Sequence, residues 1–183
     1  MDIYKLKLSQ KEAALAASVT SRSVQNWAER GYIVPQSDKI VSHVGGGTKG
    51  ANRTFTFYGV MHLAMTQALI NAGLSEVKRA AAEAGLFAYG GGGGDIYDLP
   101  DREPGFPFHP NCGATVFAVG PYGSHDELWT PGKARDTYGN LRHRVGAGMV
   151  MVEPLDLFRD VVGRLGFNPG ELLDTAYPDA ATA

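Results

Sequence analysis

The sequence predicts an α+β fold in three parts: a helical N-terminal domain, a linker rich in glycine and proline, and a small C-terminal α+β domain. Two short helix patterns followed by two strand-like runs support the first part. Five consecutive glycines at 90–94 cannot hold a helix and interrupt the chain. We therefore place the domains at 1–89 and 111–183, with the linker at 90–110.

The composition is that of a globular protein. Of 183 residues, 44% are apolar and 20% are charged, and no run of about 18 apolar residues occurs. The N-terminus lacks the pattern of a secretory signal, so we expect a cytoplasmic protein with no membrane association. Cys112 is the only cysteine, which excludes an intrachain disulfide and a cysteine-rich zinc site.

Two helices are predicted close together near the N-terminus. Ser9 and Glu12 form the S-x-x-E pattern of a capping box, so the first helix begins there and ends near Ala17. Thr20 is a suitable N-cap for the second, and Gly31 is a residue typical of a C-cap. The helices are therefore separated by a turn of about three residues.

Two strands and two further helices follow. The runs at 39–44 and 53–57 predict a hairpin whose tip is GGGTKGAN. Apolar residues then recur at helical spacing from Tyr58 to Ala72, and a last helix runs from Ser75, its predicted N-cap, to about Phe87.

A helix, a tight turn and a second helix can place the second helix in the major groove of DNA. Val24 and Trp27 share the inner face of the second helix, so Arg22, Gln25 and Asn26 point away from the core. Arginine can donate two hydrogen bonds to guanine, and asparagine or glutamine can bond to adenine.

Other polar residues are placed to contact phosphate. Hydroxyl groups lie at the start of the second helix, and cations lie in the predicted hairpin, which would form a wing beside that helix. The predicted DNA-binding set is Thr20, Ser21, Arg22, Ser23, Gln25, Asn26, Arg30, Thr48, Lys49 and Arg53. The alternative is that the polar face is only solvated.

Charge is unevenly distributed along the chain. Residues 1–90 hold ten Lys/Arg and six Asp/Glu, a net +4, whereas residues 91–183 hold seven and thirteen, a net −6, which together give −2. A basic first half and an acidic second half fit a DNA-contacting head with a body that does not touch DNA.

The order of elements resembles the winged helix-turn-helix domain of MerR-type transcriptional regulators. RSVQNWAERGYIVP is similar to the recognition helix and its exit, NRTFTF to the wing strand, and VMHLAMTQALINAGLSEVKRA to the two helices that follow. The resemblance implies that Arg22, Ser23, Gln25 and Asn26 face the groove and that Arg53 holds phosphate. The glycines at 90–94 replace the long dimerisation helix of that family.

In the second half, strands are predicted at 114–119 and 145–153, with turns between them. Pro154 then begins an amphipathic helix that ends before Gly166. We expect its apolar stripe to form a homodimer interface, or else to cover the domain's own sheet. The stripe consists of Leu155, Leu157, Phe158, Val161, Val162 and Leu165.

We expect no enzyme activity, cofactor or metal. His109, Cys112, His125, Asp126, Glu127 and His143 are scattered and do not form a recognisable site. The sequence thus predicts a bacterial or phage-type regulator of transcription that binds duplex DNA, with RNA polymerase or another regulator as a further partner. An excisionase-like architectural protein and a protein-interaction module without DNA binding are the alternatives.

Overall fold

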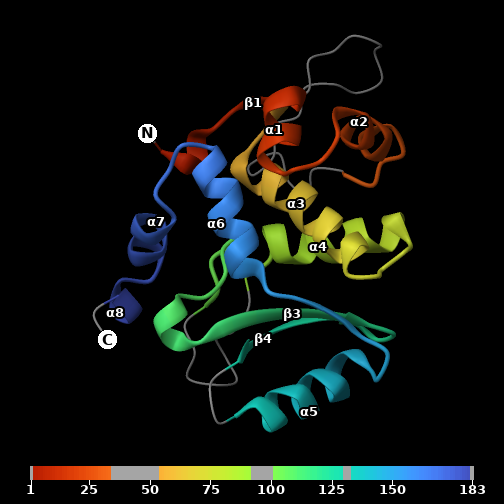
Figure 1. Cartoon of the computed structure of the whole chain (residues 1–183), viewed down its shortest axis with the longest axis vertical. Coiled ribbons are helices and arrows are strands. Elements are labelled where there is room, and N and C mark those ends of the chain that lie inside the picture. Colours follow the sequence, from red (N-terminus) through yellow and green to blue (C-terminus); the bar gives the residue numbers. More distant parts are fainter. Residues whose placement is uncertain (1, 34–53, 92–100, 130–132, 182–183) are drawn as a thin grey trace.

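A computed structural model describes residues 2–33, 54–91, 101–129 and 133–181 (Figure 1). Its helices are α1 Gln10–Ala16, α2 Ser21–Glu29, α3 Phe57–Asn71, α4 Val77–Tyr89, α5 Ala134–Val145, α6 Pro154–Arg164, α7 Pro169–Ala176 and α8 Pro178–Ala181. Its strands are β1 Leu8–Ser9, β2 Thr54–Phe55, β3 Ala114–Gly120, β4 Gly123–Trp129 and β5 Val150–Val152. The predicted α+β class is confirmed.

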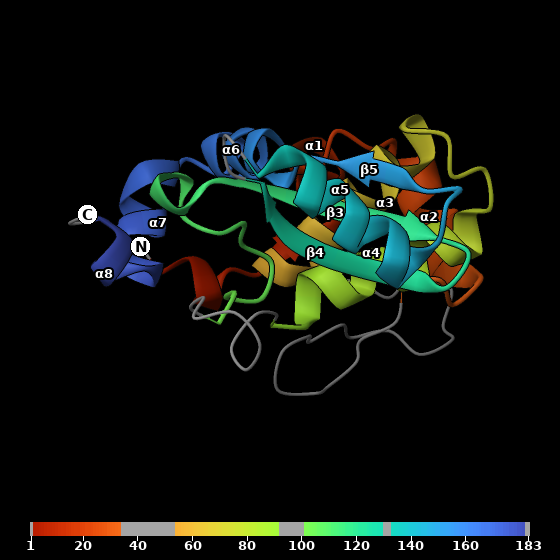
Figure 2. The same cartoon turned by 90° about the horizontal axis from the view of Figure 1, so that it is seen from below.

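Three layers make up the lower half of the molecule in Figure 1. An antiparallel sheet with strand order β4-β3-β5 has α5 on one face and α3, α4 and α6 towards the other (Figure 2). Alternation along β3 explains this: Phe117 and Val119 belong to the main core, whereas Val116 and Ala118 pack with α5. Both faces of the sheet are therefore covered.

The helices at the N-terminal end agree with the predicted positions, but the second strand run is shorter than expected. Among its described residues, only Thr54 and Phe55 belong to a strand, and they pair antiparallel with Ser9 and Leu8. Thr56 caps α3, with its Oγ1 accepting from the Gly59 N–H at 3.4 Å. The predicted strand at 39–44 and the hairpin tip lie outside the described residues.

The start of α4 also differs from the prediction. Glu76 occupies the N-cap position instead of Ser75, and it makes no side-chain capping bond. Gly73, at φ 112°, ends the turn after α3 as expected.

One apolar core crosses the predicted domain boundary. The ring centroids of Phe57 on α3 and Phe106 lie 5.3 Å apart, and Phe106 lies 4.8 Å from Phe158 on α6. All three side chains are fully buried. The residues before and after the glycine run therefore fold around the same core rather than around two separate ones.

The predicted linker is accordingly wrong for residues 101–110. Arg102, Phe106, Phe108 and His109 are all buried. Gly105, at φ 74°, brings the segment so close to Phe57 that a Cβ there would lie 3.2 Å from the ring. The phenylalanines between the prolines anchor this segment in the core.

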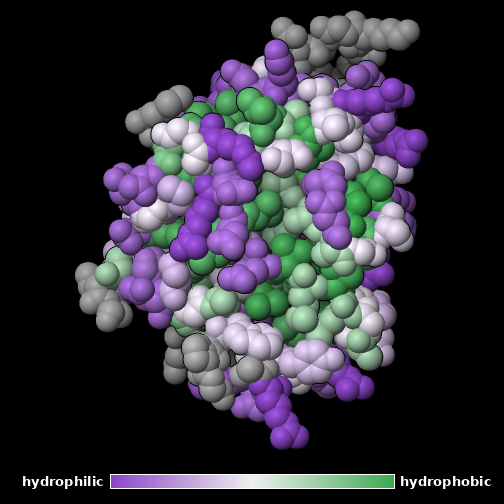
Figure 3. Space-filling view, viewed as in Figure 1, coloured by the Kyte–Doolittle hydropathy of each residue, from purple (hydrophilic) through white to green (hydrophobic). Residues whose placement is uncertain are grey.

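Most of the apolar stripe predicted as a dimer interface is buried inside the chain, although Leu157 and Leu165 are partly exposed. Phe158, Val161 and Val162 have no exposed surface, and Leu155 is 8% exposed. The helix α6 that carries them packs against α1, α3 and β3, while its outer face is hydrophilic (Figure 3). This stripe therefore packs on the protein's own core, as in the alternative to a dimer interface given above.

The segment between the two predicted C-terminal strands holds a strand and a helix instead of turns. β4 pairs along its whole length with β3, and α5 ends at Val145, where the second strand was expected to begin. The observed strand β5 is confined to Val150–Val152. The helices α7 and α8 were not predicted.

No helix in the described ranges combines the length and hydrophobicity needed to cross a membrane.

Candidate nucleic-acid interface

Helix α1 is fixed at its start by a complete capping box. Ser9 Oγ accepts from the Glu12 N–H at 3.3 Å, and the Ser9 N–H donates to Glu12 Oε2 at 2.7 Å. These bonds hold the pKa of the Glu12 carboxyl below its usual value. Small side chains on the inner face of α1, including Ala13 and Ala14, are buried and let α2 approach closely.

The turn after α1 is tight and uses a left-handed residue. Ser18 has φ 54°, a conformation that glycine usually supplies. The Val19 N–H donates to the Ala14 carbonyl at 2.9 Å, which closes the end of the helix. The chain can thus turn from Ala17 to Thr20 within three residues.

Helix α2 is seated by two side chains and capped at both ends. Val24 is fully buried and Trp27 is 7% exposed. Thr20 Oγ1 accepts from the Ser23 N–H at 3.0 Å, and Gly31, at φ 68°, follows the C-cap. The inner face therefore fixes the orientation of the helix. The side chains of the outer face do not pack against the core.

A polar contact also ties the two helices together. Gln10 Nε2 on α1 donates to the Ser21 carbonyl at 3.0 Å. This residue was not among the predicted site residues, because a glutamine at the first position of a helix is common. It fixes the N-terminal end of α2 relative to α1.

The structure places the predicted α2 residues on one exposed surface. Ser23 is half-buried, and the others are exposed: Thr20, Ser21, Arg22, Gln25, Asn26 and Arg30. Thr48, Lys49 and Arg53 lie outside the described residues. The described residues of the predicted set thus lie together on α2 and at its two ends.

Two arginines give this surface its charge. Arg22 and Arg30 form no ion pair or hydrogen bond with any residue in the described ranges. Lys11 is exposed on α1 beside Gln10 and adds a cation that sequence reasoning missed. These guanidinium and ammonium groups keep their hydrogen-bonding capacity for an anion.

One acidic residue lies among them. Gln25 Nε2 donates to Glu29 Oε1 at 2.8 Å, one helical turn further on. The bond partly occupies an amide that could otherwise read a base, and the carboxylate would repel phosphate.

The N-terminal end of α2 adds uncharged donors. The first N–H groups of a helix have no partner within it, and the helix dipole favours an anion there. The hydroxyls of Thr20 and Ser23 lie 2.9 Å apart and share a hydrogen bond. The end of α2 therefore presents backbone N–H groups, hydroxyls and the Arg22 side chain together.

The possible metal or catalytic residues of the second half do not converge. His109 Nε2 lies 3.1 Å from Asp174, His125 Nε2 lies 3.5 Å from Glu127, and Asp126 pairs with Arg102. Within the described ranges, no group of three such side chains could hold a metal ion.

The sequence matches no known family model and shows significant similarity to no curated protein.

Proposed function

We propose that the protein is a sequence-specific, duplex DNA-binding regulator of transcription that uses a winged helix-turn-helix at its N-terminal end. The observation that carries this proposal is that the two faces of α2 have different roles. Val24 and Trp27 seat the helix, while Arg22, Gln25 and Asn26 are exposed and contribute nothing to the core. A rigid helix with an outward row of base-reading side chains suits the major groove.

The chemistry of this row suits mixed base readout. Arg22 would donate to the O6 and N7 atoms of guanine, and Asn26 would bond to the N6 and N7 atoms of adenine. Ser21 and the free N–H groups at the start of α2 would hold a phosphate and set the register of the helix.

The wing remains part of the proposal. The pairing of β2 with β1 holds Thr54 beside Ser9, directly before α1. The chain therefore returns to the helix pair immediately after the predicted tip. Lys49 and Arg53 would contact the phosphate backbone there.

A second copy would strengthen binding. One such module buries only about 600 to 1,000 Å² on DNA, so two copies on paired half-sites would supply a specific affinity. Because the stripe of α6 is buried, the dimer would use another surface.

Selection of bound duplexes from a random library, followed by sequencing, tests the proposal. Wild-type protein should enrich a motif. Arg22→Ala should lose about 1 to 3 kcal/mol on that motif and relax the preference at one base pair. Arg159→Ala removes an exposed helical arginine from α6 and serves as the matched control. Absence of an enriched motif with folded wild-type protein would reject the proposal.

A further inference from the structure

Helix α5 has one face that serves the fold. Thr137, Leu141 and Val145 recur every fourth residue and are buried, 5%, 0% and 1% exposed. Leu141 and Val145 pack with Ala118 on the outer face of the sheet. This stripe fixes which side chains of α5 point away from the protein.

An exposed side of α5 beside this stripe carries positive charge. Arg135, Tyr138 and Arg142 follow one another at spacings of three and four residues, so they share one side of the helix, and all three are exposed. Neither arginine has an ion pair or hydrogen bond with a residue of the described chain. Hydrophilic side chains project from this end of the molecule in Figure 3.

The net charge of α5 is opposite in sign to that of the surrounding sequence. Residues 111–183 hold six Lys/Arg and nine Asp/Glu, a net −3. Residues 133–145 hold four of those six cations (Lys133, Arg135, Arg142 and Arg144) and one acid, Asp136, a net +3. The acidic half of the chain thus contains one basic helix, in which Arg135 and Arg142 share one exposed side.

The helix also contains a glycine that no contact in the described structure requires. Gly139 lies within α5, and a Cβ built on it would meet no atom within 4 Å. Glycine in a helix interior costs about 0.5 to 1 kcal/mol relative to alanine. Gly139 lies between Arg135 and Arg142 along the axis, on the side of the helix turned away from the buried stripe, so it lets another backbone approach the helix closely beside the two arginines.

Two exposed aromatic side chains accompany the arginines. Tyr138 is 42% exposed and Tyr122 is 79% exposed. The Tyr122 N–H donates to the Val145 carbonyl at 3.1 Å, which places this tyrosine at the C-terminal end of α5. Each tyrosine offers a hydroxyl that can donate to a phosphate oxygen.

From these observations we infer that the exposed face of α5 is a second contact surface for duplex DNA, binding its phosphate backbone without reading sequence. Arg135 and Arg142 lie seven residues apart, about 10.5 Å along the axis, close to the width of about 12 Å that separates the strands across the major groove. They could therefore reach phosphates on both sides of one groove. The close approach at Gly139 fits a groove better than a flexible acidic peptide.

The two surfaces lie at opposite ends of the molecule. Figure 1 shows α2 in the upper part and α5 at the bottom, and Figure 2 shows α5 on the side away from the helical layer. One straight duplex cannot follow both surfaces. The arrangement therefore implies that one molecule bridges two DNA segments.

To test the α5 surface alone, the full chain should carry Arg22→Ala and Arg30→Ala, which weaken the α2 surface. Binding of this background variant to a fluorescent duplex of arbitrary sequence is then measured at low salt. This background should still bind. Adding Arg135→Gln and Arg142→Gln should weaken binding about tenfold or more and reduce the salt slope by about 1.8, since each neutralised phosphate contributes about 0.9. Adding Lys5→Gln and Arg159→Gln removes the same charge elsewhere and should leave binding within about twofold.

A second variant separates shape from charge. Gly139→Leu keeps every charge and improves helix propensity, so it should not lower the melting temperature. It should nevertheless weaken duplex binding in the same background by about fivefold, because the side chain blocks close approach. Bridging can be measured with one duplex held on beads and a second duplex in solution. When either change is made in otherwise wild-type protein, the beads should retain less of the second duplex.

The outcomes distinguish the two surfaces. Loss of all binding in the Arg22→Ala, Arg30→Ala background would overturn the α5 surface and leave the α2 proposal intact. Unchanged binding there, with loss on changing Arg135 and Arg142, would support α5 and count against α2. The inference would be overturned if replacing Arg135 and Arg142 left the affinity for duplex unchanged. It would also be overturned if single-stranded DNA competed more strongly than duplex DNA for the protein.

Discussion

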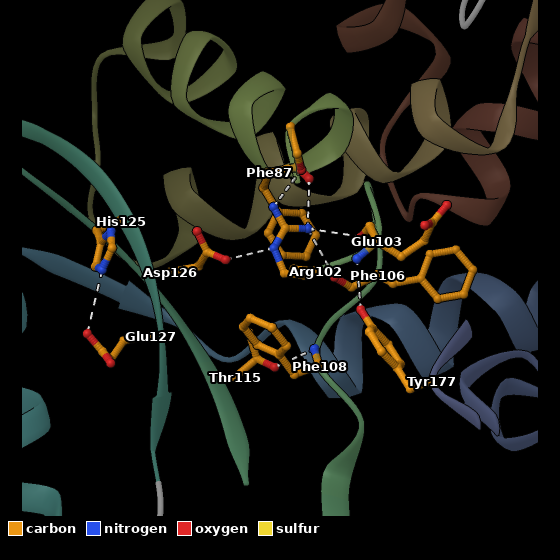
Figure 4. A network of polar contacts seen from close by, with 11 residues as sticks. Phe87, Arg102, Glu103, Phe106, Phe108, Thr115, His125, Asp126, Glu127 and Tyr177 are labelled. Carbon is orange, nitrogen blue, oxygen red and sulfur yellow. Dashed lines mark hydrogen bonds and ion pairs between the residues drawn. The ribbon is translucent and has the colours of Figure 1, made fainter. Parts of the chain in front are cut away.

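Arg102 Nε donates to Asp126 Oδ2 at 2.8 Å, and this ion pair joins the segment that leads into β3 to strand β4 (Figure 4). The arginine side chain is 2% exposed and that of the aspartate 18%. Arg102 also donates to the carbonyls of Phe87, Glu103, Phe106 and Gly90. Its guanidinium carbon lies 4.3 Å from the centre of the Phe87 ring.

Replacing Arg102 should therefore be strongly destabilising. Arg102→Met keeps an apolar stem of similar length but leaves the Asp126 carboxylate without its partner. This should lower the free energy of unfolding by about 3 to 5 kcal/mol. Urea unfolding of the full chain measures the change. Arg159→Met on α6 breaks an exposed pair with Asp156 and should cost less than about 1 kcal/mol. Equal midpoints for the two variants would contradict the role of the buried network.

The N-terminal helices could be predicted because their signals are local. Ser9 with Glu12, Thr20 and Gly31 are end signals that act within one turn of the chain, and each is used in the structure as expected. The inward orientation of Val24 and Trp27 followed from helical spacing alone. Exposure of the predicted α2 residues follows from the same geometry.

The second half was harder to predict because its contacts are long-range. Strand β4 reads GSHDELW, and its acids do not alternate with apolar residues in the usual way. Asp126 is accommodated by Arg102, which is distant in sequence, and Glu127 lies beside His125 on the face covered by α5. Helix α5 has few apolar residues, so its periodicity is weak.

The shared core was hidden for a related reason. Glycine and proline around residues 90–110 are typical of a linker, and nothing local shows that Phe106 meets Phe57 and Phe158. An amphipathic stripe such as that of α6 shows that a helix is covered on one side. It does not show whether the covering surface belongs to the same chain.

Buried His62 should make stability depend on pH. Burial lowers its pKa to about 4, although Nε2 donates to the Ala81 carbonyl at 2.7 Å, while Nδ1 has no hydrogen-bond partner among the described residues. The unfolded chain takes up the proton near pH 6.5 and the folded chain only near pH 4. Stability is therefore full above pH 6.5 and should fall by roughly 3 kcal/mol as the pH drops to 4.

Comparison with His62→Phe isolates this effect. Phenylalanine cannot be protonated and can keep the edge contact with Tyr89. The stability difference between wild type and variant, followed by urea unfolding from pH 7.5 to 4, should shift steadily in favour of the variant. A constant difference for His62→Phe would rule out burial of a neutral imidazole.

The Thr20 cap offers a way to separate folding from DNA binding. Thr20→Ala removes the acceptor for the Ser23 N–H and should cost about 1 kcal/mol of stability. Thr20→Asp keeps an acceptor and should stay within about 0.5 kcal/mol of wild type, yet its carboxylate would repel a phosphate at the start of α2. Unfolding and duplex binding should therefore rank the two variants in opposite orders. The same order in both assays would place phosphate elsewhere.

Glu29 should limit the affinity of the α2 surface. It is the acid on the exposed face and accepts a hydrogen bond from Gln25. Glu29→Gln removes the charge and keeps an oxygen acceptor for that amide. Near a phosphate, removing one like charge at the surface gains about 1 kcal/mol, roughly fivefold in affinity, and the gain should shrink as salt increases.

The matched control for this variant is Asp160→Asn on α6, which neutralises an exposed acid that bonds Arg164 one turn further along. It changes net charge by the same amount but lies on a different helix, so its effect on duplex binding should be less than about twofold. Salt titrations of both variants with the same duplex provide the measurement. An equal gain for both would attribute the effect to net charge, and no gain for Glu29→Gln would mean that DNA does not approach this face of α2.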